Sequence, residues 1–248
     1  QTGWDASAFR GVIESSIDAA RSVDAVPTWV LGNHDVVRPT TRYGLPEGVD
    51  ASRWLLDGPH DDLDAELGLR RWRAAVLMML ALPGAAYLYQ GEELGLPEVW
   101  DLPESVLHDP IWERSGRTEK GRDGCRVPMP WTPDGPSFGF GSNGTWLPQP
   151  ATFGALSVAS QEGTLGSTLE MVRTALDLRR RHGKADETAE LIDLGEDVVA
   201  FRRPAGLSCV VNMGSRPADL PGATVLLASA DVAGGVLQPD DAVWMLEE

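Results

Sequence analysis

The sequence predicts an α/β unit followed by a small antiparallel β domain. A helical pattern, a short apolar strand and a polar loop follow one another twice in the first part of the chain. Near residue 190 the spacing of apolar residues changes to a period of two, and Gly and Pro separate the short runs. These patterns divide the chain into residues 1–185 and residues 186–248, the second predicted to be an antiparallel β-sandwich.

The composition is that of a globular protein with an acidic surface. Of the 248 residues, 42% are hydrophobic and 23% are charged, and the formal net charge is -16. A charge of this sign repels nucleic-acid phosphates and anionic membrane surfaces. No stretch approaches the roughly 20 uninterrupted apolar residues that a membrane-spanning helix needs. We therefore expect neither nucleic acid nor a membrane among the partners.

The cysteines and the start of the chain carry further expectations. Cys125 and Cys209 lie far apart with no second cysteine near either, so we expect two buried free thiols. No ligand spacing indicates a metal, and no cofactor is expected. The chain opens at Gln1 without an initiating Met or a signal-peptide pattern, which predicts that the sequence begins inside a longer protein. A cytoplasmic location is the expectation, although this start does not identify a compartment.

The first helix, strand and loop are predicted over residues 5–35. Asp5 can cap a helix that ends before Val26 and Pro27. The apolar positions at helical spacing are Phe9, Val12, Ile13, Ile17 and Ala20. A buried strand over residues 28–31 follows, and it ends at a polar cluster, Gly32-Asn33-His34-Asp35. Polar residues at the carboxyl end of a strand are where α/β folds keep their chemistry.

The second helix, strand and loop are predicted over residues 64–93. The helix spans residues 64–82, with Trp72 at a core position, and Pro83-Gly84 ends it. A strand over residues 85–89 leads into Gln90-Gly91-Glu92-Glu93. Glu92 and Glu93 are adjacent residues of a turn and point apart, so we expect them to be structural.

Residues 96–150 form a long irregular stretch rich in Pro, Gly, Trp and Asp, which we interpret as an active-site loop wall. Trp131 and Trp146 are its best candidates for stacking on sugars, and His60 and His108 are expected to be solvated loop residues. A further helix begins at Ser167 and runs through Arg181. The strands that follow are predicted over residues 197–202, 207–212 and 223–227.

The most specific cluster is the segment from Trp29 to Arg38, in which His34 and Asp35 stand side by side at a strand exit. From the residues alone, the segment could also be a capped loop. In that alternative, Asp35 binds backbone amides and Arg38 pairs with a carboxylate at the surface. Histidine and aspartate are often adjacent without any function, so spacing does not decide between the two.

Three motifs in order carry a resemblance to the alpha-amylase superfamily. Asn33-His34-Asp35 resembles the fourth conserved motif of that family, and residues 85–95 are similar to its last barrel strand and the following turn. Residues 122–131 resemble the R-D-x-x-R-x-P-M-x-W segment of its alpha-glucosidase and oligo-1,6-glucosidase branch. The resemblance covers essentially the whole chain and is weakest over the last sheet domain. It implies that residues 1–185 are the C-terminal part of a TIM (β/α)8 barrel.

The resemblance also implies roles for four residues. The family uses a nucleophilic Asp, an acid/base Glu and a third Asp, and it retains the anomeric configuration through a covalent intermediate. Asp35 matches the third Asp, a transition-state stabiliser, and His34 would bind the same sugar ring. Arg122 matches an arginine that pairs with an Asp of the early barrel below a one-sugar pocket. Arg38 matches the arginine just past the motif, which orients neighbouring carboxylates; His34, Arg122 and Arg38 are thus the predicted substrate-binding set.

An alternative for Arg122 is a loop-stabilising ion pair with Asp123 or Glu119. The family's other motifs, D-x-x-x-N-H, G-x-R-x-D and the strand with the acid Glu, occur nowhere in the sequence. We therefore expect a fragment of a retaining alpha-glucosidase whose missing partner is the N-terminal half of the barrel. Without the nucleophile and the acid/base it should be inactive, and its open strand edge should make it poorly soluble.

The expected substrates of the parent protein are short alpha-glucoside oligosaccharides of the maltose, isomaltose or sucrose type. Three alternatives stay open. The first is a sister activity such as trehalose synthesis or amylosucrase-like transglycosylation. The second is a non-enzymatic, glucosidase-like protein of the type that partners transporters. The third is a free-standing carbohydrate-binding module.

Overall fold

The computed structural model describes residues 3–183 and 188–246. The chain forms two compact units, each described here by itself. Unit 1 consists of Gln1–Leu31, Arg70–Tyr87 and Met171–Glu248, and unit 2 consists of Gly32–Leu69 and Leu88–Glu170. The predicted boundary between residues 185 and 186 lies outside the described residues and stays a prediction.

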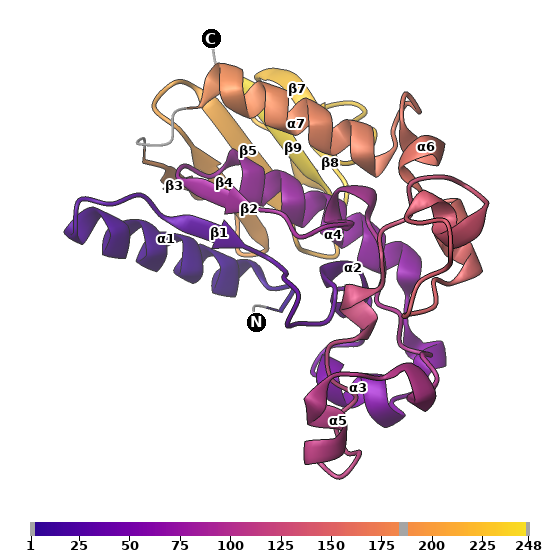
Figure 1. Ribbon diagram of the computed structural model, residues 1–248. Helices are drawn as coiled ribbons and strands as arrows, with labels where there is room; N and C mark the ends of the chain where they lie inside the picture. Colours follow the sequence, from indigo (N-terminus) through magenta and orange to yellow (C-terminus); the bar gives the residue numbers. More distant parts are fainter. Residues whose placement is uncertain (1–2, 184–187, 247–248) are drawn as a thin grey trace. The chain divides into compact units, whose positions relative to one another are not determined.

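Helices and strands alternate in the first part of the chain, and strands follow one another in the last (Figure 1). The α-helices of the described residues are α1 (Ala6–Ser22), α2 (Pro39–Arg42), α3 (Ala51–Asp57), α4 (Ala65–Ala81), α5 (Pro110–Arg114), α6 (Val158–Gln161) and α7 (Thr168–His182). Their strands are β1 (Thr28–Val30), β2 (Ala85–Tyr87), β3 (Glu190–Ile192), β4 (Val198–Arg202), β5 (Leu207–Asn212), β6 (Ala218–Asp219), β7 (Thr224–Ala228), β8 (Val236–Leu237) and β9 (Ala242–Leu246). Short 3-10 helices are η1 (His60–Asp62), η2 (Glu92–Leu94), η3 (Glu104–Val106), η4 (Gly124–Arg126), η5 (Pro136–Gly139) and η6 (Ala151–Gly154).

In unit 1, α1 begins where the sequence predicts. The carboxylate of Asp5 accepts a hydrogen bond from the Ala8 amide at 2.6 Å, which satisfies a free amide of the first turn. Phe9, Ile13 and Ile17 are buried along one face. Val12 does not share that face, because its side chain is 45% exposed. Of the five predicted positions, three are therefore buried, Ala20 is half-buried and Val12 is exposed.

Strands β1 and β2 pair in parallel, with Thr28 opposite Ala85 and Val30 opposite Tyr87. Both strands are shorter than predicted. Gly84 sets their register, because its φ is +91° and a Cβ at this position would lie 2.1 Å from the carbonyl oxygen of Pro27. This close approach lets the Ala85 amide donate to the same carbonyl at 2.9 Å. The pairing of β1 with β2 thus depends on a residue without a side chain.

The rest of unit 1 is dominated by a five-stranded antiparallel sheet in the order β3-β4-β5-β9-β7. A second pair of strands, β6 and β8, is also antiparallel. The buried side chains that form the core shared by the two sheets are Val198, Ala200, Val210, Leu237, Val243 and Met245. Strand β9, which lies between β5 and β7, was not predicted, and neither were the short strands β3, β6 and β8. Strands β4, β5 and β7 lie within one residue of the predicted ranges.

Hydrogen bonds to backbone carbonyls join the helices of unit 1 to its strands. The indole nitrogen of Trp244 in β9 donates to the carbonyl of Leu77 in α4 at 3.0 Å. Arg10 of α1 donates to the carbonyls of Glu196 and Val198 at 2.9 and 2.7 Å. The predicted core residue Trp72 is fully buried on α4. Within residues 3–183 and 188–246, no helix combines the length and apolar character needed to cross a bilayer.

Unit 2 is built from the long connections that follow β1 and β2 in the chain. Residues 96–150, all of which the structure describes, contain short helices and no strand, in agreement with the irregular stretch predicted there. Their role as an active-site wall stays a prediction. These loops have a core of their own, formed by Leu94, Leu96, Val99, Leu102, Val127, Met129, Phe153 and Leu169. A smaller cluster contains Val37, Leu45, Trp54 and Leu55. The irregular segment is therefore packed, which gives the side chains on it a defined position.

We expect Gly84→Ala to destabilise the protein by about 2–4 kcal/mol, because alanine has both an unfavourable φ and a steric clash at this position. Gly234→Ala is the matched control in the same unit. Gly234 also has a positive φ, +67°, but no atom lies within 4 Å of the point that its Cβ would occupy. The control should lose only about 1 kcal/mol. Thermal denaturation of the full-length protein with either substitution would contradict this account if both variants lost equal stability.

Candidate active site

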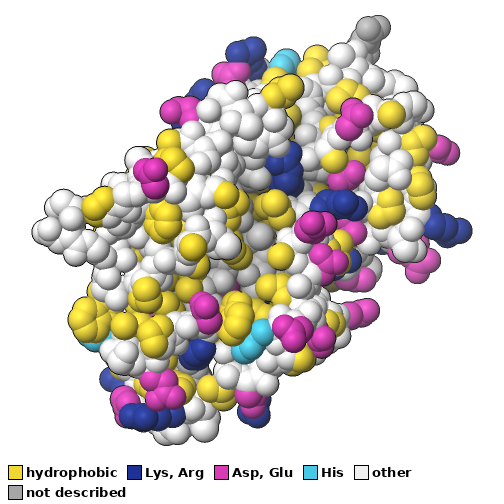
Figure 2. All heavy atoms as spheres, turned by 90° about the vertical axis from the view of Figure 1, so that its right-hand side faces the viewer, with side chains coloured by type: hydrophobic (Ala, Val, Ile, Leu, Met, Phe, Trp, Pro, Cys, Tyr) yellow, Lys and Arg dark blue, Asp and Glu magenta, His cyan; other side chains and the backbone are white. Residues whose placement is uncertain are grey.

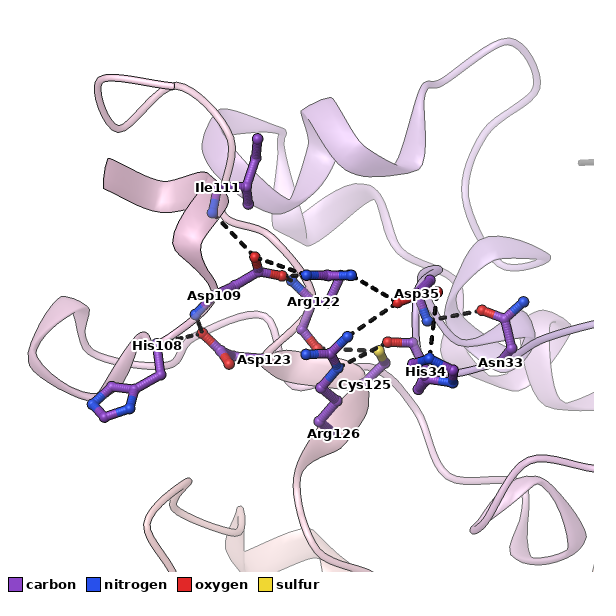
Figure 3. Close-up of polar contacts among 10 residues, drawn as sticks. All are labelled: Asn33, His34, Asp35, His108, Asp109, Ile111, Arg122, Asp123, Cys125 and Arg126. Atoms are coloured by element: carbon purple, nitrogen blue, oxygen red, sulfur yellow. Dashed lines mark hydrogen bonds and ion pairs between the residues drawn. The ribbon is translucent and has the colours of Figure 1, made fainter. Parts of the chain in front are cut away.

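The predicted catalytic aspartate stands on a polar turn just after β1. The side-chain oxygen of Asn33 accepts a hydrogen bond from the Asp35 amide at 2.8 Å, which closes the turn (Figure 3). The Asp35 carboxylate is 46% exposed. In the capped-loop alternative, Asp35 would bind backbone amides; instead its carboxylate meets side chains of the R-D-x-x-R segment.

Two arginines converge on one oxygen of Asp35. Arg122 donates from Nη1 to Oδ1 of Asp35 at 2.9 Å, and Arg126 donates from Nη2 to the same oxygen at 3.0 Å. Arg126 also donates from Nε to the His34 carbonyl at 2.9 Å. The hydrogen bond from Arg122 is the main reason that the pKa of Asp35 is lowered, with partial burial opposing it and His34 and Arg126 lowering it further. Asp35 is therefore ionised at neutral pH.

The sequence did not single out Arg126, although it is the second arginine of the R-D-x-x-R motif. The short helix η4 begins two residues after Arg122 and ends at Arg126, and both side chains reach the same carboxylate. The signal that could have identified Arg126 is its position, because it is a second arginine four residues after Arg122.

His34 and Asp35 form the pair that the sequence predicts. Nε2 of His34 lies 3.4 Å from Oδ2 of Asp35, the oxygen that the arginines leave free. The His34 side chain is 62% exposed. Its ring centroid lies 6.3 Å from that of Tyr89. The imidazole and one carboxylate oxygen thus remain accessible to a ligand.

Arg122 has a second partner that the sequence did not indicate. Its Nε donates to Oδ2 of Asp109, and its Nη2 donates to Oδ1 at 3.1 Å. The predicted alternative partners were Asp123 and Glu119, but the Asp123 carboxylate accepts the backbone amides of His108 and Asp109 at 2.7 and 2.8 Å. The ion pair with Asp109 corrects that alternative. Arg122 lowers the pKa of Asp109 to about 2, so this carboxylate is also ionised.

Arg38 is buried, which excludes the alternative of a surface ion pair. Only 2% of the residue is exposed. Its guanidinium donates from Nη1 to the Gln90 carbonyl at 2.9 Å and from Nη2 to the Cys125 carbonyl at 2.8 Å. Its own amide donates to the Glu98 carboxylate at 2.9 Å. The Arg38 side chain thus binds the backbone of the segments that carry the site, and its place in the substrate-binding set stays a prediction.

Glu92 is structural, as expected. It is 2% exposed, and its carboxylate accepts the Tyr89 amide at 2.9 Å within the turn after β2. Burial raises the pKa of Glu92 to about 7. Both cysteines are free and buried, and burial raises the pKa of the Cys125 thiol to about 12.

The two stacking candidates of the loop wall are exposed. Trp131 is 49% exposed and Trp146 is 60% exposed, and Figure 2 shows hydrophobic side chains scattered among acidic and basic ones on the face it presents. Trp146 donates from its indole nitrogen to the Val106 carbonyl at 2.9 Å, and its ring lies 4.3 Å from His108. His60 was expected to be solvated, but its ring stacks on Trp100 at 3.8 Å. Within the described part of the chain, no group of three or more His, Cys, Asp or Glu residues could hold a metal ion.

The site and fold define a class of protein, and comparison with known families agrees. Residues 2–187 match the model described as "Alpha amylase, catalytic domain". The chain therefore belongs to the alpha-amylase family of glycoside hydrolases. It has the fold that the motifs imply, the C-terminal part of a TIM barrel followed by an antiparallel β domain.

Individual relatives place the sequence within that family. It is 34% identical over 197 residues to a probable alpha-glucosidase of Rhizobium meliloti, a match that covers 77% of this chain and 32% of the relative. It is 34% identical over 138 residues to the trehalose synthase/amylase TreS of Mycobacterium tuberculosis, covering 48% of this chain and 20% of the relative. The crystal structure of the alpha-glucosyl transfer enzyme XgtA is similar with a TM-score of 0.73 and 30% identity, covering 98% of this chain and 44% of that one. The chain is alpha-glucosidase-like and spans about a third of the length of the Rhizobium relative.

We expect the Asp35 carboxyl group to titrate below 3.8, its ordinary pKa, in the full-length protein. Replacing Arg122 by glutamine removes the strongest hydrogen bond to Asp35, so the Asp35 pKa should rise. Arg126→Gln is the matched variant and should raise the pKa less. Carbon-13 NMR of the aspartate carboxyl groups, assigned with Asp35→Asn, measures both. An equal titration midpoint of Asp35 in the Arg122→Gln variant and in the unsubstituted protein would contradict the hydrogen bond between Arg122 and Asp35.

The raised pKa of the buried Glu98 carboxyl group makes the stability of the protein depend on pH. Burial raises the pKa of Glu98 from 4.5 to about 7, so its protonated form is favoured by folding. The contribution of Glu98 to the free energy of unfolding is fully present below pH 4.5, and it is lost as the pH rises through 7. We expect Glu98→Gln to reduce the loss of unfolding free energy over this range, by at most about 3 kcal/mol. Glu92 also has a raised pKa, so part of the pH dependence of the unfolding free energy should remain in the Glu98→Gln variant. Glu47→Gln, at an exposed position, is the control. It should leave the pH dependence unchanged when the unfolding free energy is measured by denaturant titration at pH 4.5 and 7.5.

Proposed function

We propose that this chain is the C-terminal part of the catalytic module of a retaining alpha-glucosidase. The enzyme would remove alpha-linked glucose from the non-reducing end of short oligosaccharides such as maltose, isomaltose or sucrose. The observation that carries the proposal is the Asp35 carboxylate, accessible beside His34 and bound by Arg122 of the R-D-x-x-R segment. The name of the Rhizobium relative supports the same activity.

The geometry suits a group that binds the sugar ring and stabilises positive charge. Ionised Asp35 can accept hydrogen bonds from sugar hydroxyls at Oδ2, the oxygen that neither arginine occupies. Its negative charge favours the flattened, oxocarbenium-like transition state over the ground state. His34 can donate to the same ring. Arg122 borders the pocket, and Arg38 holds the segments in place.

The remaining catalytic groups must come from residues outside this chain. The motifs that would carry the nucleophilic Asp and the acid/base Glu are absent from the sequence. We propose that these groups, and an acidic partner for Arg122, belong to the N-terminal half of the barrel in the full-length protein. Asp35 alone neither attacks the anomeric carbon nor transfers a proton, so the isolated chain would not hydrolyse a glucoside.

Glucosyl transfer is the second candidate function. Two comparisons favour it, those with TreS and with XgtA. Both reactions use the same glycosyl intermediate and differ in whether water or a sugar hydroxyl accepts it. A non-enzymatic role and a free-standing binding module are weaker candidates, because neither requires the paired His34 and Asp35.

We expect the full-length protein to release glucose from maltose or isomaltose. Asp35→Asn should lower kcat/KM by about 10²–10³-fold, the scale seen when one transition-state contact is lost. Asp50→Asn, which alters an exposed helix cap in the same unit, is the control. The isolated 248-residue chain should show no hydrolysis and should aggregate in gel filtration. Di- and trisaccharide products in place of glucose would establish transfer; an unaffected Asp35→Asn would overturn both candidates.

A further inference from the structure

We propose that Asp109 is a positioning residue of the sugar pocket, which aims the guanidinium of Arg122 at Asp35. The inference rests on the proposed function and assigns a role to a residue outside the three sequence motifs. Asp109 does not contact Asp35. It would act on substrate binding only through Arg122.

The first argument is the division of the Arg122 nitrogens. Nε and Nη2 bind the two oxygens of the Asp109 carboxylate, and Nη1 is left for Asp35. A guanidinium is planar, so a carboxylate that holds two of its nitrogens also fixes the direction of the third (Figure 3). The Arg122 amide donates to Asp109 as well, at 3.0 Å. The aim of Nη1 therefore follows from the position of Asp109.

The second argument is that Asp109 is itself immobilised. Its side chain is 1% exposed. Its Oδ1 accepts the Ile111 amide at 3.1 Å and caps α5, in which Pro110 occupies the first position. Its own amide donates to Asp123 at 2.8 Å. A carboxylate held by the loop core and by a helix end gives Arg122 a fixed support, unlike an exposed aspartate.

The third argument is the residue that precedes Arg122. Gly121 has a φ of +80°, and a Cβ there would lie 2.8 and 2.9 Å from Cβ and Cγ of Asp109. A residue with a side chain at position 121 would therefore clash with Asp109, and only glycine lets the backbone pass it this closely. The loop is thus shaped at Gly121 to bring Arg122 onto Asp109.

A role as a helix cap alone does not account for this arrangement. The cap requires one acceptor for the Ile111 amide, whereas Asp109 binds Arg122 through both of its oxygens. Asp50 caps α3 through the Arg53 amide at 2.8 Å and provides the matched comparison. Serine also caps helices but cannot bind a guanidinium at two points. Asp109→Ser therefore separates the cap from the support of Arg122.

The test is a double-mutant cycle in the full-length protein, with maltose as the substrate. Asp109→Ser should lower kcat/KM by about 10–100-fold, because a displaced guanidinium misplaces the sugar. In the Arg122→Gln background, Asp109→Ser should have no further effect on kcat/KM, because the guanidinium through which Asp109 acts is absent. The effects of the two substitutions on Tm need not cancel. Asp50→Asn should leave kcat/KM unchanged.

Two results would overturn the inference. One is an unchanged kcat/KM in Asp109→Ser, and the other is an equal loss in the presence and absence of Arg122. The Asp35 carboxyl titration gives a readout independent of turnover, and Asp109→Ser should raise its midpoint; the other groups that face Asp35 are the His34 imidazole and the Arg126 guanidinium. If the parent protein has no glycosidase or transfer activity, the proposed function fails. The titration then still decides whether Asp109 aims Arg122, and an unmoved midpoint would refute it.

Discussion

The buried guanidinium of Arg38 is the interaction on which the arrangement of unit 2 depends. Its two terminal nitrogens bind carbonyls that lie 52 and 87 residues away in the chain. One carbonyl belongs to the turn after β2, and the other belongs to η4 between Arg122 and Arg126. Because Arg38 itself follows Asp35 closely, the same side chain brings the aspartate and its two arginines together. A lysine has one ammonium group in place of the planar fork and could not bind both carbonyls with this geometry.

Much of the fold followed from local pattern, and the exceptions have physical reasons. Helix α1 was recognisable because Asp5 and the spacing of Phe9, Ile13 and Ile17 agree with each other. Val12 was misplaced because helical spacing allows a wider stripe than the one the structure buries. Strand β9 escaped notice because Val243, Trp244 and Met245 are all buried, so it lacks the alternation that marks a half-exposed strand. Its pairing with β5 and β7 depends on tertiary structure, which a local sequence pattern does not encode.

The candidate site was predictable only where residues stand in a recognisable motif. His34, Asp35 and Arg122 were found by their resemblance to family motifs, which periodicity alone would not have provided. Asp109 was missed because it lies 13 residues before Arg122 in an irregular loop. Sequence proximity suggested Asp123, yet that carboxylate is taken up by backbone amides of the same loop. Which of several nearby acids meets an arginine depends on how the loop reverses, here at Gly121.

The sharing of Arg122 between an exposed and a buried carboxylate links the proposed recognition of a sugar to the folding of the loop. A substitution that removed this arginine to change the pocket would also strand an ionised Asp109 inside the loop. The pocket and the loop therefore cannot be altered independently by changing that residue. Under the proposed function, a change of sugar preference at this position would therefore require the paired replacement of Arg122 and Asp109.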